Sequence, residues 1–138
     1  MRAHINPMSE LHIEVPLNPK YTQWNLHWPS FFSLAPNNDD KIVVNTGKYQ
    51  IDYKQRNTYL ESKVPTILDI GCGYGGLMFA LTKYFPDNLI LGQEIRDKVS
   101  NFVAEKANTK RINSGYKECL NVAVVRTNTM KTVHNYFE

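Results

Sequence analysis

The sequence of 138 residues contains only two cysteines, Cys72 and Cys119, and no long hydrophobic run. Two cysteines are too few for a disulfide scaffold or a cysteine-rich zinc site, and His4 has no partners at metal-ligand spacing, so no metal site is expected. A membrane-spanning helix needs ~20 consecutive apolar residues, and no run approaches that length. No apolar segment follows the first four residues, so a secretory signal is not expected. These absences exclude disulfide-rich secreted proteins and integral membrane proteins, and they predict an intracellular protein with reduced thiols.

Charge is also modest, with a formal net charge of +3, but it is unevenly distributed. Residues 96–131 contain eight Lys and Arg against three acidic residues, whereas the preceding part is nearly balanced. A basic second half is compatible with a polyanionic partner. A solvated helix face explains the same charges equally well.

The chain divides into two parts of different composition. Residues 1–64 are predicted to be an N-terminal arm of turns and extended pieces, because five of the seven prolines lie in the first 40 residues together with several large aromatics. Residues 42–53 alternate in the manner of a hairpin. Residues 65–138 form the second part, in which the hydrophobic pattern is regular.

From residue 65 the hydrophobic pattern alternates between strands and helices. Helices are expected at 74–85 and 97–112, with Leu77 and Phe102 on their apolar faces, and a short last helix is expected to be lined by Met130. The strands between them are expected at 66–70, 89–94 and 121–127. This order predicts an α/β fold, a parallel sheet with helices on both faces, of which about three strands are present.

The first strand runs directly into a glycine-rich segment, Gly71-Cys72-Gly73-Tyr74-Gly75-Gly76, and then into a helix. Glycines allow a sharp turn and a close approach to a ligand, and the free amides of a helix N-terminus favour an anion. Glu94 ends the second strand, where an acid accepts hydrogen bonds from both ribose hydroxyls. This spacing predicts a nucleoside-cofactor site, and a tight turn alone would leave Glu94 unexplained.

Asp69 bears on which cofactor binds. The spacing of Gly71, Gly73 and Gly76 also fits dinucleotide-binding proteins. A carboxylate at residue 69 would repel a pyrophosphate, whereas it would attract the ammonium group of S-adenosylmethionine. We therefore expect S-adenosylmethionine rather than NAD, with a structural role for Asp69 in the loop as the alternative.

The third strand ends in Arg126-Thr127-Asn128-Thr129-Met130. Ligands of such sheets bind outside the carboxyl ends of the strands, so Asn128 is a candidate for the adenine edge. It is equally well placed to cap the last helix.

Taken together, these residues resemble the eukaryotic tRNA (guanine-N7-)-methyltransferase family. The resemblance covers nearly the whole chain except about residues 37–64, and it includes segments at 2–8, 28–32, 69–77, 85–96, 98–100 and 126–130. The glycine loop is common to many methyltransferases, whereas the N-terminal segments and Glu94-Ile95-Arg96 are specific to this family.

The resemblance implies a Rossmann-like methyltransferase fold and a set of S-adenosyl-L-methionine contacts. Glu94 would hold the ribose and Asn128 the adenine. The family usually has Ala where Thr129 stands, so that contact would be through the backbone. The full implied cofactor-binding set is Gly71, Gly73, Glu94, Arg96, Asn128 and Thr129.

The resemblance also implies that residues 65–138 are the cofactor-binding half of the methyltransferase domain, without its C-terminal catalytic half, and that the activity is that of a longer protein. That protein would methylate guanine N7 in the variable loop of tRNA, with a WD-repeat β-propeller subunit as its partner and the nucleus as its location. The family's guanine-binding Asp would lie beyond residue 138, so no catalytic residue is expected within this chain and the chain alone should be inactive. The alternatives are a non-catalytic half-domain that binds S-adenosylmethionine or a partner and, less favoured, an NAD-dependent oxidoreductase.

Overall fold

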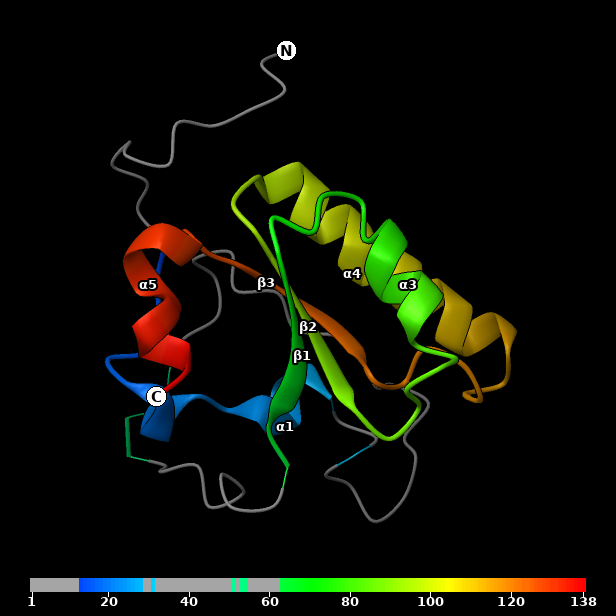
Figure 1. Ribbon diagram of the computed structural model, residues 1–138, viewed down its shortest axis with the longest axis horizontal. Helices are drawn as coiled ribbons and strands as arrows, with labels where there is room; N and C mark the ends of the chain where they lie inside the picture. The colour runs from blue at the N-terminus through cyan, green and yellow to red at the C-terminus, as the bar shows by residue number, and fades with distance from the viewer. Residues whose placement is uncertain (1–12, 29–30, 32–50, 52, 55–62) are drawn as a thin grey trace.

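The computed structural model describes residues 13–28, 31, 51, 53–54 and 63–138. An arm with two short helical segments precedes an alternation of strands and helices (Figure 1). The elements are η1 (Pro19–Tyr21), α1 (Trp24–His27), β1 (Pro65–Ile70), α3 (Gly76–Leu81), β2 (Leu89–Glu94), α4 (Asp97–Asn113), β3 (Val122–Arg126) and α5 (Thr129–Tyr136).

The three strands form one parallel sheet in the order β1-β2-β3. Ile67 of β1 pairs with Ile90 of β2, and Ile90 pairs in turn with Val122 of β3. Every residue of β2 is buried. This is the environment that a continuous apolar run such as residues 89–91 requires, because a central parallel strand is covered on both faces.

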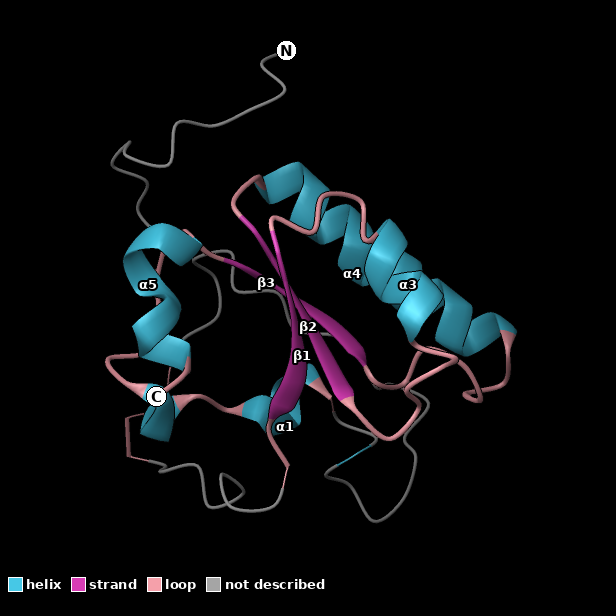
Figure 2. Cartoon of the chain, in the orientation of Figure 1, coloured by secondary structure: helices cyan, strands magenta, loops and turns pink. Residues whose placement is uncertain are grey.

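Helices α3 and α4 lie on one side of the sheet and α5 on the other (Figure 2), and a hydrophobic cluster covers each face. Met78 of α3 and Val103 of α4 pack with Ile90 and Val124 on one face. On the other face, Tyr136 of α5 joins the arm and strand residues Leu89, Leu91, Ala123 and Val125. The predicted α/β fold, with a parallel sheet, helices on both faces and three strands, is confirmed.

The described part of the arm packs on the second face. Trp24 and Trp28 are 1% and 0% exposed, and both belong to the cluster beneath α5. Asn135 of α5 donates from its Nδ2 to the carbonyl oxygens of Pro16, at 2.8 Å, and Leu17, at 3.3 Å. The arm therefore forms part of the layer that covers β2 and β3.

The ends of α4 follow from its sequence. Asp97 lies in its first turn and Lys110 and Arg111 in its last, which complements the helix dipole. Gly115 then adopts a φ of 64°, and the Tyr116 N–H donates to the Arg111 carbonyl at 2.7 Å. A left-handed glycine just past the last turn is a common way to end a helix.

Several predicted apolar faces are wrong in detail. Leu77, Phe102 and Met130 are 58%, 47% and 71% exposed, whereas Met78 is fully buried. Helix α3 is also shorter than the helix expected at 74–85. Gly75 occupies its N-cap in the left-handed region, and turns follow Leu81. In so short a helix the apolar residues lie on several sides, and the position of the sheet decides which side is buried.

Other expectations fall largely outside the described residues. These are most of the hairpin at 42–53 and the N-terminal segment at 2–8. The division of the chain at residue 64 stays a prediction. Among the helices that the structure describes, none has the length and apolar character needed to span a membrane.

Strand β1 differs from the other two in its exposure. Its residues alternate between half-buried and exposed, so Leu68 and Ile70 are 36% and 61% exposed. They lie on the face opposite Ile67, which packs against the cluster of α3 and α4. The second hydrophobic layer therefore covers β2 and β3 more completely than β1.

Gly92 provides a test of this packing. A Cβ built there would lie 2.5 Å from the Met78 Sδ and 2.8 Å from the Cys72 Sγ. We expect Gly92→Ala to lower the free energy of unfolding by about 1–3 kcal/mol, the usual cost of overpacking a core. Urea denaturation measures this change.

The matched control is Gly76→Ala, since a Cβ at Gly76 would meet no atom within 4 Å in the part of the chain that the structure describes. Its stability should equal or exceed that of the unchanged protein. Equal stability for the Gly92 and Gly76 variants would contradict the described contact between β2, α3 and the glycine loop.

Candidate cofactor-binding site

The glycine loop is fixed to the carboxyl end of β2. The Gln93 carbonyl oxygen accepts hydrogen bonds from the Gly71 and Cys72 N–H groups, at 2.7 and 3.1 Å. Gly71 and Gly73 have φ values of 67° and 54°, in the left-handed region that favours glycine. A Cβ at Gly71 would have no atom of the described residues within 4 Å, so these residues leave open space that a side chain there would fill.

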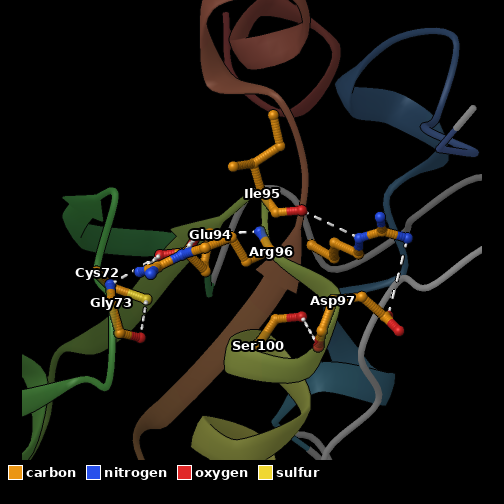
Figure 3. Close-up of polar contacts among 8 residues, drawn as sticks. Cys72, Gly73, Glu94, Ile95, Arg96, Asp97 and Ser100 are labelled. Carbon is orange, nitrogen blue, oxygen red and sulfur yellow. Dashed lines mark hydrogen bonds and ion pairs between the residues drawn. The ribbon is translucent and has the colours of Figure 1, made fainter. Parts of the chain in front are cut away.

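Glu94 ends β2 beside this loop, and its carboxylate is 4% exposed (Figure 3). Its Oε2 accepts from the Gly73 N–H at 3.1 Å and from the Arg96 Nη2 at 3.2 Å. Its Oε1 accepts from the Arg96 backbone N–H at 2.9 Å and from the Arg96 Nε at 3.1 Å. Three of the predicted residues, Gly73, Glu94 and Arg96, therefore lie in direct contact.

These four bonds use the whole capacity of the carboxylate, which has about four lone-pair positions. Arg96 supplies three of the four donors. Two further donors at this carboxylate, such as the hydroxyls of a ribose, would therefore replace the two guanidinium donors of Arg96.

The ionisation of Glu94 follows from the same contacts. Burial by itself raises the pKa of Glu94, but hydrogen bonds from Arg96, the charge of Arg96 and the Gly73 N–H together hold this pKa below its usual value. The stabilisation from these contacts is therefore present at neutral pH and is lost as the pH falls through the lowered pKa. The carboxylate is ionised at neutral pH, as an acceptor of ribose hydroxyls must be.

Asp69 lies near the end of β1, two residues before Gly71. Its Oδ2 is buried and has no hydrogen-bond partner in the part of the chain that the structure describes. Burial raises the pKa of Asp69. An unpaired buried carboxylate oxygen is costly unless a donor or a cation reaches it. The ammonium group of a bound amino-acid moiety would satisfy it, whereas a pyrophosphate would not.

The end of β3 lies beside the end of β2. Glu94 pairs in register with Arg126, and the Thr127 N–H donates to the Glu94 carbonyl at 3.2 Å. Asn128 takes the N-cap position of α5, but its side chain makes no capping hydrogen bond there. The alternative role as an N-cap is therefore realised in position only, and contact of Asn128 with adenine stays a prediction.

The side chain of Thr129 contacts Gln93 and not Glu94 in the described structure. Its hydroxyl donates to the Gln93 Oε1 at 2.7 Å. Because Gln93 and Glu94 point to opposite faces of β2, this side chain is engaged away from the Glu94 carboxylate. A cofactor contact of Thr129 through its backbone is compatible with this arrangement and stays a prediction.

Arg126 and Asp97 lie at this edge but were not among the predicted site residues. The Arg126 Nε donates to the Ile95 carbonyl at 3.1 Å, and the Arg126 Nη1 lies 3.8 Å from the Asp97 Oδ1. These contacts fix the segment between β2 and α4, from which Arg96 reaches Glu94. The sequence feature that could have pointed to Arg126 is its position at the end of the third strand. The parallel register places it opposite Glu94 at the carboxyl edge.

Cys72 is unsuited to covalent chemistry despite its place in the loop. Burial, followed by the negative charges of Asp69 and Glu94, raises the pKa of the Cys72 thiol to about 12. The thiol is therefore protonated at neutral pH, and the thiolate is the nucleophilic form. Within the described ranges, no group of three His, Cys, Asp or Glu residues could hold a metal ion.

A glycine loop between β1 and α3, with an acid at the end of β2, is typical of α/β proteins that bind a nucleoside cofactor at the carboxyl edge of the sheet. Comparison with known proteins defines the family more closely. The sequence model of the family described as "Putative methyltransferase" matches residues 63–138. The chain belongs to this family.

Curated relatives agree with this assignment over 99% of the chain. The tRNA (guanine-N(7)-)-methyltransferase of Arabidopsis thaliana is 37% identical over 137 residues, which cover 45% of that protein. The proteins of the same name from Eremothecium gossypii and Xenopus laevis are 38% and 36% identical, with 41% and 46% of their lengths covered. The chain thus spans less than half the length of these relatives, and the predicted resemblance is confirmed.

Proposed function

We propose that this chain is the cofactor-binding part of a longer S-adenosylmethionine-dependent enzyme that methylates guanine N7 in tRNA. The observation that carries the proposal is the joining of the glycine loop to Glu94 through the Gly73 N–H, in a chain whose relatives are named for this activity. The residues present fit the cofactor, because among the described residues Gly71 borders open space and a buried oxygen of Asp69 has no hydrogen-bond partner.

The proposal gives particular side chains of the site distinct roles in holding the cofactor. Glu94 accepts hydrogen bonds from the ribose hydroxyls once the guanidinium of Arg96 has moved away from the carboxylate. Asp69 attracts the ammonium of the amino-acid moiety, and Asn128 contacts the adenine edge. When bound, S-adenosylmethionine supplies a methyl group activated by an adjacent sulfonium. Guanine N7 carries a free lone pair, so the protein has to orient the two reactants and needs no strong base.

Further parts of the proposal come from the resemblance. They are the variable loop as the position of the guanosine, a WD-repeat β-propeller subunit as partner, and a nuclear location. The Asp that contacts guanine would lie in the longer protein outside this chain. The spacing of the glycines is compatible with NAD, but Asp69 disfavours a pyrophosphate, so a nicotinamide-dependent oxidoreductase is the weaker alternative.

Glu94→Ala tests the ribose contact. Loss of hydrogen bonds to a charged group is expected to weaken S-adenosylmethionine binding by ~1.5–3 kcal/mol, roughly a 10- to 150-fold rise in Kd. Isothermal titration of the native-length protein measures this change, with a parallel titration of NAD. Circular dichroism of each variant verifies that it is folded.

Glu105→Ala is the matched control, because Glu105 is exposed on α4. It should bind S-adenosylmethionine as the unchanged protein does. An unchanged Kd for the Glu94 variant would remove Glu94 from the site, and preferential binding of NAD would favour the oxidoreductase.

The activity is tested by incubating the native-length protein, with any subunit that co-purifies, with S-adenosylmethionine and unmodified tRNA. We expect 7-methylguanosine at one position of the variable loop, detected by mass spectrometry of nuclease fragments. A tRNA with adenosine at that position serves as the control and should remain unmodified. Methylation of another base, or of protein, would refute the proposed substrate.

A further inference from the structure

A groove of about 550 Å³ lies at the opposite end of the sheet from the glycine loop. Its walls come from α3 and the turn after it, the end of α4, the segment that leads into β3, and Phe31 of the arm. The segments after α3 and α4 lead into β2 and β3 (Figure 1), so the groove is at the amino edge of the sheet. It is separate from the cofactor site, which is at the carboxyl edge.

Buried polar side chains hold the walls of this groove in place. Arg111 of α4 is fully buried, and it donates to the carbonyl oxygens of Cys119, Leu120 and Val122. Asn121 donates from its Nδ2 to the carbonyl oxygens of Phe85, at 2.8 Å, and Asn88, at 2.9 Å. Thr82 also donates to the Asn121 Oδ1. The groove is therefore a preformed feature in which three segments are tied together.

The groove is strongly basic. Lys83, Lys110 and Lys117 line it, each from a different segment, against one acidic residue, Glu118. Lys106 lies close by, since the Nζ atoms of Lys106 and Lys110 lie 4.8 and 5.8 Å from the centre of the Phe79 ring. In the described part of the chain, none of these four ammonium groups lies within an ion-pair distance of a carboxylate.

The lysine ammonium groups that meet at this groove create a positive potential there. Positive charges that are not paired within the protein attract a polyanion, and lysines contact phosphates as point charges without reading sequence. A cation over an aromatic ring is held in place while it keeps its charge. The groove therefore has the chemistry of a phosphate-backbone contact.

We propose that this lysine groove, formed around Lys83, Lys110 and Lys117, binds the sugar-phosphate backbone of the RNA substrate. The proposal rests on the proposed function, which supplies the RNA. The strands of six residues separate the two edges of the sheet by about 20 Å, at ~3.3 Å per residue. A folded RNA is large enough to contact both edges, whereas a mononucleotide is not. The groove would thus add affinity at a distance from the methylated base.

The test replaces the three lysines by glutamine, Lys83→Gln, Lys110→Gln and Lys117→Gln together, in the native-length protein. Binding of fluorescent tRNA is measured by anisotropy over a series of salt concentrations. Each lost phosphate contact lowers the slope of log K against log salt concentration by about 0.7–0.9, so the slope should become shallower by about two to three. S-adenosylmethionine binding should not change.

Lys20→Gln is the matched control, because Lys20 is exposed on η1, which contacts α5 on the other side of the molecule. It should leave the slope unchanged. If the triple variant keeps the slope of this control, the lysine groove is not an RNA contact, and the proposed function is unaffected. If the unchanged protein binds S-adenosylmethionine but no tRNA, both proposals fail.

Chemical footprinting of the unchanged protein tests the same proposal without relying on variants that have to fold. Lysines of the unchanged protein are acetylated with and without tRNA and are quantified by mass spectrometry. We expect tRNA to protect Lys83, Lys110 and Lys117 and to leave Lys20 reactive. Bound tRNA that protects none of the three would overturn the proposal. Protection by a co-purifying protein subunit without RNA would assign the lysine groove to a protein interface instead.

Discussion

The burial of β2 on both edges and both faces is the constraint on which the rest of the structure depends. Its backbone pairs with β1 and β3, while α3 and α4 cover one face and α5 with the arm covers the other. At its carboxyl end the same strand holds the glycine loop through the Gln93 carbonyl and presents Glu94. The fold and the candidate site therefore share one element, and a change that moves β2 moves both.

The candidate site is organised around the buried carboxylate of Glu94. In the structure described here, Arg96 and Gly73 satisfy Glu94, which compensates for burying a charge. Arg96 is partly exposed and lies next to α4, so it is able to leave without uncovering the core. Binding of a nucleoside would exchange donors at Glu94 and leave the total of its hydrogen bonds similar. Asp69, by contrast, has a buried oxygen that no hydrogen bond from the described residues satisfies.

Much of this arrangement could be predicted from the sequence, because it depends on local patterns. Residues 89–94 are read correctly as a strand, since the apolar run is short and is followed by an acid. The turn at the glycines and the place of Glu94 follow from spacing. The burial of Met78 in place of Leu77 could not be predicted, because a helix as short as α3, with apolar residues on several sides, does not specify which side meets the sheet. Phe102 lies on the long helix α4, where its half-exposed ring packs against the ring of Tyr74, a contact between segments that the sequence pattern does not show. The contact of Arg96 with Glu94 depends on the path of the chain after β2, which Arg126, a residue distant in sequence, fixes through its contacts with Ile95 and Asp97. Likewise, the excess of basic residues is visible in the sequence, but the meeting of Lys83, Lys110 and Lys117 at one groove depends on the tertiary fold.

The central claim, that Glu94 exchanges Arg96 for a ribose, is tested most directly by a crystal structure of the native-length protein with S-adenosylmethionine. The account predicts both ribose hydroxyls within hydrogen-bond distance of the Glu94 carboxylate and the guanidinium of Arg96 displaced from it. A structure in which the cofactor is bound while all three Arg96 donors remain on Glu94 would contradict the account, and so would a cofactor bound away from the glycine loop.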